Sequence, residues 1–171
     1  LTESVGLTAA AADGSRFEGT IDLGSLVDVG DQQGFAIEQV DFIWQNGINW
    51  DSNPEGMLAN NGSFGAQLSD LNPGTVFNRA DDNNLIASGH LNIDVANNIT
   101  SSDSDFYPDS FGKLDESRIV VNDQLYLVCG NDGADVGAAT VFNTVRIKGR
   151  IVKLSTKDWM AIAIQSTASD N

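Results

Sequence analysis

The feature that most constrains this chain is the alternation of apolar and polar residues over residues 85–96. Odd-numbered positions carry small or apolar side chains, and even-numbered positions from 88 to 94 carry polar ones. Because successive side chains of a strand point to opposite faces, this period of two predicts a strand with one buried face. An amphipathic helix would need apolar residues three and four positions apart, so this segment excludes one.

Shorter apolar runs separated by turn-forming residues fill most of the remaining chain. The 17 glycines and 16 asparagines favour many turns and few helices. Apolar residues change parity between Ile37 and Val40, which predicts a β-bulge near Glu38 and Gln39. The pair Asn122-Asp123 predicts a hairpin-type turn. Further strands are expected over residues 16–23, 26–29, 34–45, 64–68, 74–77, 118–121, 124–129, 140–155 and 158–165.

Together these segments predict an all-β protein built as one domain, since 171 residues suit a single core. Two irregular stretches, 46–63 and 97–117, are too long for hairpin loops and are expected to cross between sheets. The predicted architecture is a single jelly-roll β-sandwich or barrel of about eight strands with long crossing loops. Residues 16–171 form this domain, and residues 1–15 are expected to be an N-terminal arm, either extended or loosely ordered.

The charge of the chain restricts both its solvent and its partners. Of the 24 acidic residues 19 are Asp, only four Lys oppose them, and the net charge is −15. Such a surface repels itself in dilute buffer, whereas molar salt shortens the Debye length to about 3 Å. Adaptation to brine is therefore expected; an ordinary acidic extracellular or marine protein is the alternative. The acidity argues against direct contact with nucleic acid and against an anionic membrane surface as the main partner.

No arrangement of residues predicts catalysis. His90 is the single histidine and lies on the polar face of its strand, away from any nucleophile motif. Cys129 shares parity with Leu125 and Leu127, so a buried structural thiol is expected. The protein is therefore not expected to be an enzyme.

Two acidic segments are candidates for a structural calcium site. Asp132 and Asp135 lie in one, and Asp103 and Asp105 lie in the other. Carboxylate oxygens suit calcium, but neither segment has the spacing of an EF-hand, and turn-forming Asp residues are the alternative explanation. No cofactor is expected apart from such a cation.

Three cations mark a candidate contact surface between subunits. Arg146, Lys148 and Arg150 alternate with apolar residues, so they project from one face of one strand. On so acidic a protein they suit an acidic neighbouring copy; a solvated face that discourages aggregation is the alternative. Trp50 is the candidate exposed aromatic anchor at an interface or ligand site.

Two parts of the sequence resemble a known family. The first comprises IDLGSLVDVGD (21–31) and IEQVDFIWQ (37–45), and the second comprises VNDQLYLV (121–128) and RIVKLSTKD (150–158). These segments, about half of the chain, resemble the small major capsid proteins of icosahedral, internal-membrane viruses of halophilic archaea, of the single vertical jelly-roll lineage. These segments resemble the family in their general sequence pattern, and none of them contains a diagnostic motif.

The resemblance implies a structural protein of the virion, whose eight-stranded jelly roll packs into pseudo-hexameric capsomers. Its partners would be copies of itself and a second, larger capsid protein. The viral membrane would lie nearby without being spanned, and no apolar run of this chain is long enough to span one. Two alternatives stay open: a calcium- or aromatic-dependent carbohydrate-binding module that uses Trp50, or a spike, vertex or cell-surface component.

Overall fold

The computed structural model describes residues 1–47, 54–108 and 117–167. Within them the chain forms nine strands and a final helix. The strands are β1 (Thr2–Leu7), β2 (Arg16–Asp22), β3 (Gln33–Asn46), β4 (Gly62–Ser69), β5 (Leu85–Asp94), β6 (Ile99–Phe106), β7 (Arg118–Val120), β8 (Gln124–Asp132) and β9 (Val141–Lys153). The helix is α1 (Thr156–Thr167).

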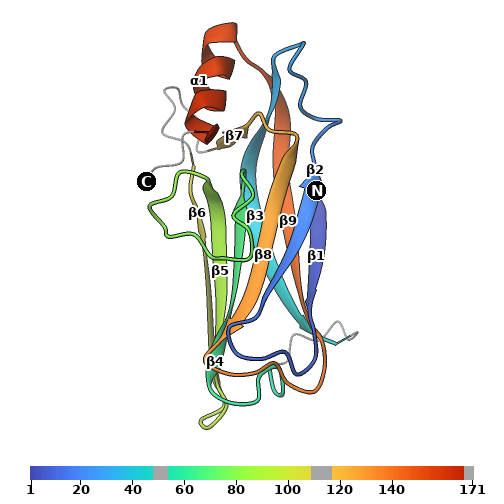
Figure 1. Cartoon of the computed structure of the whole chain (residues 1–171), viewed down its shortest axis with the longest axis vertical. Helices are drawn as coiled ribbons and strands as arrows, with labels where there is room; N and C mark the ends of the chain where they lie inside the picture. The colour runs from blue at the N-terminus through green and yellow to red at the C-terminus, as the bar shows by residue number, and fades with distance from the viewer. Residues whose placement is uncertain (48–53, 109–116, 168–171) are drawn as a thin grey trace.

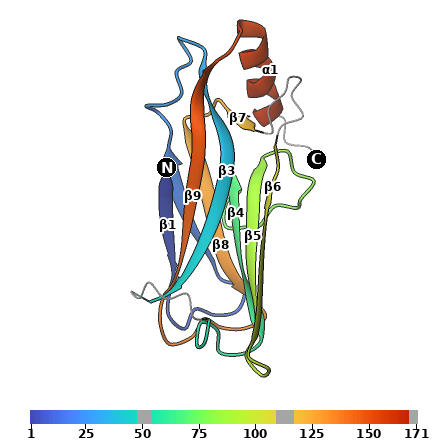
Figure 2. The same ribbon diagram turned by 180° about the vertical axis from the view of Figure 1, so that it is seen from behind.

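The strands form two antiparallel sheets that pack face to face. Sheet A has the order β1-β9-β3-β7, and sheet B has the order β2-β8-β4-β5-β6. The strands run along the longest axis of the molecule, and α1 lies at one end beside β7 (Figures 1 and 2). The predicted all-β sandwich is therefore confirmed.

The core lies between the two sheets and contains apolar side chains from both. From Ala87 to Ile93 the predicted alternation holds on β5, since Ala87 and Ile93 are buried in the core whereas His90 is exposed. It fails at the start of the strand, where the pairing with β4 shifts register and Ile86 joins the core in place of Leu85. Trp44 of sheet A stacks on Phe64 of sheet B, with ring centroids 5.4 Å apart. Both rings belong to the core cluster, so this aromatic pair joins the two sheets through the core.

The predicted bulge in β3 is confirmed. The pairing of β3 with β9 shifts register between Ile37 and Gln39. An extra residue on one strand reverses which parity points inward. As a result Ile37, Val40 and Trp44 are all buried although their numbers differ in parity.

Part of the expected N-terminal arm belongs to a sheet. Residues Thr2–Leu7 pair with β9 from Arg146 to Val141. Val5 and Leu7 are buried in the core. The sequence around these two residues has little apolar periodicity. The strand is therefore stabilised by pairing with β9 more than by the β-propensity of its own residues.

The C-terminal segment 158–165, expected to be a strand, is helical. The backbone N–H of Asp158 donates a hydrogen bond of 3.1 Å to Ser155 Oγ, which is the geometry of a helix N-cap. Ser155 and Asp158 also have the spacing of a capping box. The nearly continuous apolar run after Asp158 has no clear period, and the cap decides in favour of a helix.

Four further predictions were wrong. Residues 74–77 form no strand; they belong to a loop in which Asn72 Oδ1 accepts the Gly74 N–H at 2.8 Å. Residues 97–117 were expected to be irregular but contain β6. Residues 118–121 and 124–129 form no hairpin, because β7 pairs with β3 in sheet A and β8 pairs in sheet B. Residues 26–29 contribute only the isolated bridge between Asp28 and Gln33.

Candidate functional site

The three cations of β9 lie on the outer face of sheet A. Arg146, Lys148 and Arg150 are exposed, whereas Val145 and Ile147 between them are buried. The alternation of the strand therefore places them as the sequence predicts. We call them the cationic strip.

Members of the cationic strip differ in their partners. Arg150 forms an ion pair with Glu38, the residue at the bulge of β3. Arg146 lies across from Asp41 and Lys148 lies across from Gln39. Within the described part of the chain, neither Arg146 nor Lys148 forms an ion pair. Arg146 and Lys148 are thus exposed to solvent on the outer sheet face of a strongly acidic protein.

The carboxylates of the first candidate calcium segment, Asp132 and Asp135, contact other groups of the protein. Asp132 forms an ion pair with Arg16, with oxygen–nitrogen distances of 2.8 and 3.0 Å. Asp135 accepts the backbone N–H of Asp13 at 2.8 Å, and Asp13 in turn accepts the N–H of Gly133 at 2.7 Å. These contacts fasten the turn after β8 to the segment after β1.

The second calcium candidate lies on a strand rather than in a loop. Asp103 and Asp105 belong to β6, where they pair with His90 and Ser88 of β5. Asp103 also accepts the Ser104 N–H at 2.8 Å. Among residues 1–47, 54–108 and 117–167, no group of three or more His, Cys, Asp or Glu is placed to hold a metal ion.

His90 and Cys129 lie in different environments. His90 is exposed on the outer face of sheet B. Cys129 is fully buried, its Sγ lies 3.5 Å from Asn143 Oδ1, and burial raises the pKa of the thiol. The thiol therefore stays protonated at neutral pH.

A loop that sequence reasoning missed lies against the outer face of sheet B. Gln67 of β4 and Asn78 exchange two hydrogen bonds, at 2.7 and 2.8 Å. Phe77 covers Gly65, where a Cβ atom would lie 3.1 Å from the ring. The Arg16 guanidinium lies 4.3 Å from the centroid of the Phe77 ring. Gly65 inside the predicted strand 64–68 was the available signal, because glycine in a strand often marks a close approach.

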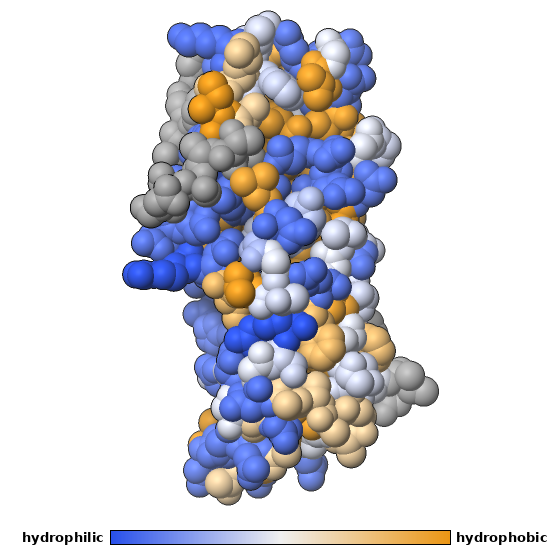
Figure 3. Space-filling view, viewed as in Figure 1, coloured by the Kyte–Doolittle hydropathy of each residue, from blue (hydrophilic) through white to orange (hydrophobic). Residues whose placement is uncertain are grey.

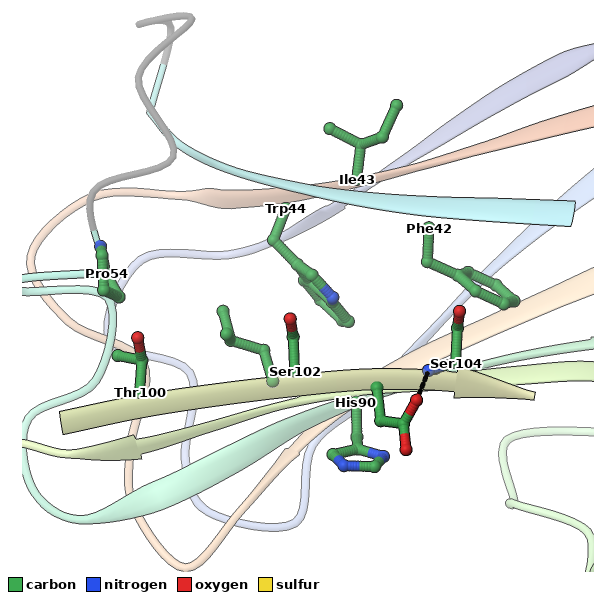
Figure 4. A pocket seen from close by; sticks show the side chains of 11 residues that line it. Phe42, Ile43, Trp44, Pro54, His90, Thr100, Ser102 and Ser104 are labelled. Atoms are coloured by element: carbon green, nitrogen blue, oxygen red, sulfur yellow. Dashed lines mark hydrogen bonds between the residues drawn. The ribbon is translucent and has the colours of Figure 1, made fainter.

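A groove of about 630 Å³ lies between β3 and the β5–β6 edge of sheet B. In Figure 4 Trp44, Phe42, Ser102 and Ser104 surround it, and His90 lies on the far side of sheet B. Trp44 is only 7% exposed and stacks on Phe64, so its ring offers little face to a ligand. Trp50 lies outside the described residues.

Hydrophobic side chains gather toward the end of the molecule that carries α1, and hydrophilic ones cover much of the rest of the face in Figure 3. Met160 and Ile164 of α1 are both more than half exposed. Within the described residues no helix is long and apolar enough to cross a membrane.

Comparison of the sequence with protein-family models and with curated proteins gives no match.

Proposed function

We propose that the chain is a structural protein whose single jelly roll packs side by side with other copies in the capsid shell of an icosahedral virus. The observation that carries this proposal is the nesting of its strand pairs. β1 pairs with β9, β2 with β8, β3 with β7 and β4 with β5, all antiparallel. Each pair encloses the next along the chain.

Nested pairing is what results when one long antiparallel hairpin rolls up into two sheets, which is the eight-stranded jelly roll. β6 is then an additional strand at the free edge of β5. Jelly rolls occur in viral capsids, lectins and cupins. The fold is therefore compatible with a few classes of function, and features of the protein surface are needed to distinguish among these classes.

The outer face of sheet A favours assembly. Two exposed cations without an ion pair within the described residues lie on one sheet face of a protein with net charge −15. Complementary charge of this kind orients partners and selects among them. The resemblance of the four sequence segments to capsid proteins of halophilic archaeal viruses supports the same class, and it proposes pseudo-hexameric capsomers shared with a larger capsid protein.

Solution mass tests this proposal. Light scattering would be measured over a range of protein concentrations in molar salt and in dilute buffer, with circular dichroism to follow folding. We expect folded oligomers in molar salt, and dissociation or unfolding in dilute buffer as self-repulsion returns. A folded monomer at every concentration in molar salt would contradict the proposal. Glycan binding by such a monomer would support the carbohydrate-binding alternative instead.

A further inference from the structure

We propose that copies of this chain associate head to tail, with Arg146 and Lys148 of one copy against Asp103 and Asp105 of the next. This inference rests on the proposed function, because it names the surface that the cationic strip contacts. It is drawn from the placement of charges on the two outer sheet faces.

The carboxylates of β6 match the cations of β9 in spacing. Residues two apart on a strand point to the same face and lie about 7 Å apart. Arg146 and Lys148 are two apart, and so are Asp103 and Asp105. Among the strands that the structure describes, β6 alone carries two carboxylates at this spacing. One strand laid along the other therefore brings two opposite-charge pairs together.

Asp103 and Asp105 are accessible on the outer side of sheet B. Every residue from Ile99 to Asp105 is exposed, and β6 is the edge strand, with β5 as its one neighbour in the sheet. Residues directly opposite in an antiparallel pair share a face. Asp103 pairs with His90, which Figure 4 shows on the side of sheet B away from Phe42 and Trp44.

Two of the other carboxylates on sheet B have partners within the chain. Asp132 is neutralised by Arg16, and Asp94 accepts hydrogen bonds from Asn97. Within the described residues neither Asp103 nor Asp105 forms an ion pair. The two cations, Arg146 and Lys148, and the two carboxylates, Asp103 and Asp105, thus have no ion-pair partner within the described residues, and a neighbouring copy would neutralise their charges.

The two rows lie on opposite outer faces of the sandwich, and this fixes the symmetry of the contact. A surface that meets a different surface of the next copy makes a heterologous interface, which closes into a ring or continues as a filament. A two-fold dimer that pairs like faces would bring the two cationic strips together. Repulsion between the two strips works against this dimer, and Asp41, which lies across from Arg146, lessens that repulsion at only one of the two unpaired cations.

Two charge-reversal variants test the inference, first each alone and then as a mixture. The first variant carries Arg146→Asp and Lys148→Asp, so both of its faces are acidic. The second carries Asp103→Lys and Asp105→Lys, so both of its faces are basic. Each alone should assemble with an apparent dissociation constant raised about tenfold or more. An equimolar mixture should regain wild-type assembly, because each acidic face then meets a basic one.

A matched control separates the contact from net charge. Lys153→Asp with Lys157→Asp changes net charge as the first variant does, at exposed positions outside the proposed contact. This control should assemble like the wild type, and circular dichroism should show all variants folded. Variants that assemble normally, or a mixture that stays dissociated, would overturn the contact while leaving the proposed function intact. Wild-type protein that never assembles would overturn both.

Discussion

Removal of the Phe64 ring should destabilise the protein more than any surface change, because this ring joins the two sheets. Phe64 is 0% exposed, and its centroid lies 5.4 Å from that of Trp44 on the opposite sheet. A buried Phe→Ala substitution loses transfer free energy and leaves a cavity, at a cost of about 3–5 kcal/mol. Since a domain of this size has a net stability of about 5–15 kcal/mol, Phe64→Ala should lose a large share of it.

Urea unfolding at constant molar salt, followed by circular dichroism, measures this loss. Phe64→Leu is the matched control, because it keeps an apolar side chain in place and should cost only about 1–1.5 kcal/mol. A double-mutant cycle with Trp44→Leu should give a coupling of about 0.5–1.5 kcal/mol for the aromatic pair. A loss below about 1 kcal/mol for Phe64→Ala would refute the inter-sheet core described here.

Two further predictions concern buried groups. The pKa of Cys129 is raised by burial, so above about pH 8.5 the unfolded thiol ionises while the folded one stays protonated. This thiol should therefore leave the free energy of unfolding unchanged below that pH and lower it as the pH rises above it. Cys129→Ala should abolish the part of the alkaline stability loss that the thiol causes. If the variant loses as much stability at alkaline pH as the wild type does, the burial of Cys129 is contradicted. Arg118 is 7% exposed and lies 3.2 Å from Asp70, which is 2% exposed. Arg118→Met should cost about 3–5 kcal/mol in urea unfolding, whereas Arg79→Met at an exposed position outside the proposed contact should change stability by less than about 0.5 kcal/mol. Equal losses would contradict the buried pair.

The two-residue period of apolar side chains predicted the strands that have one solvent-exposed face and one buried face. The alternation over β5, the parity change at Ile37 and the inward position of Cys129 were all visible in the sequence, because each depends on side chains of one strand. The placement of Arg146, Lys148 and Arg150 on one face followed for the same reason.

Elements held by their neighbours were not predictable in this way. β6 has seven exposed residues out of eight and no apolar face, so its eight backbone pairings with β5 define it. β7 is three residues long and pairs in a different sheet from β8, which no local turn signal reveals. For α1 a signal did exist in the Ser155–Asp158 cap, and the apolar run that follows concealed it.

The same limit applies to the candidate contact. Sequence spacing identified the cationic strip and, separately, Asp103 and Asp105, but it assigned the carboxylates to a loop. Only the pairing of β6 with β5 places them on the outer face of sheet B, opposite the strip. A pair of surfaces on opposite sides of a sandwich is a property of the topology, and one strand's pattern does not contain it.

The central proposal, that this β-sandwich is an assembling shell subunit, is tested most directly by electron cryo-microscopy of the wild-type protein in molar salt. We predict regular multi-subunit particles in which neighbouring sandwiches touch along their sides through the outer sheet faces. Isolated single chains under the same conditions, or particles joined only through the ends of the sandwiches, would contradict the claim.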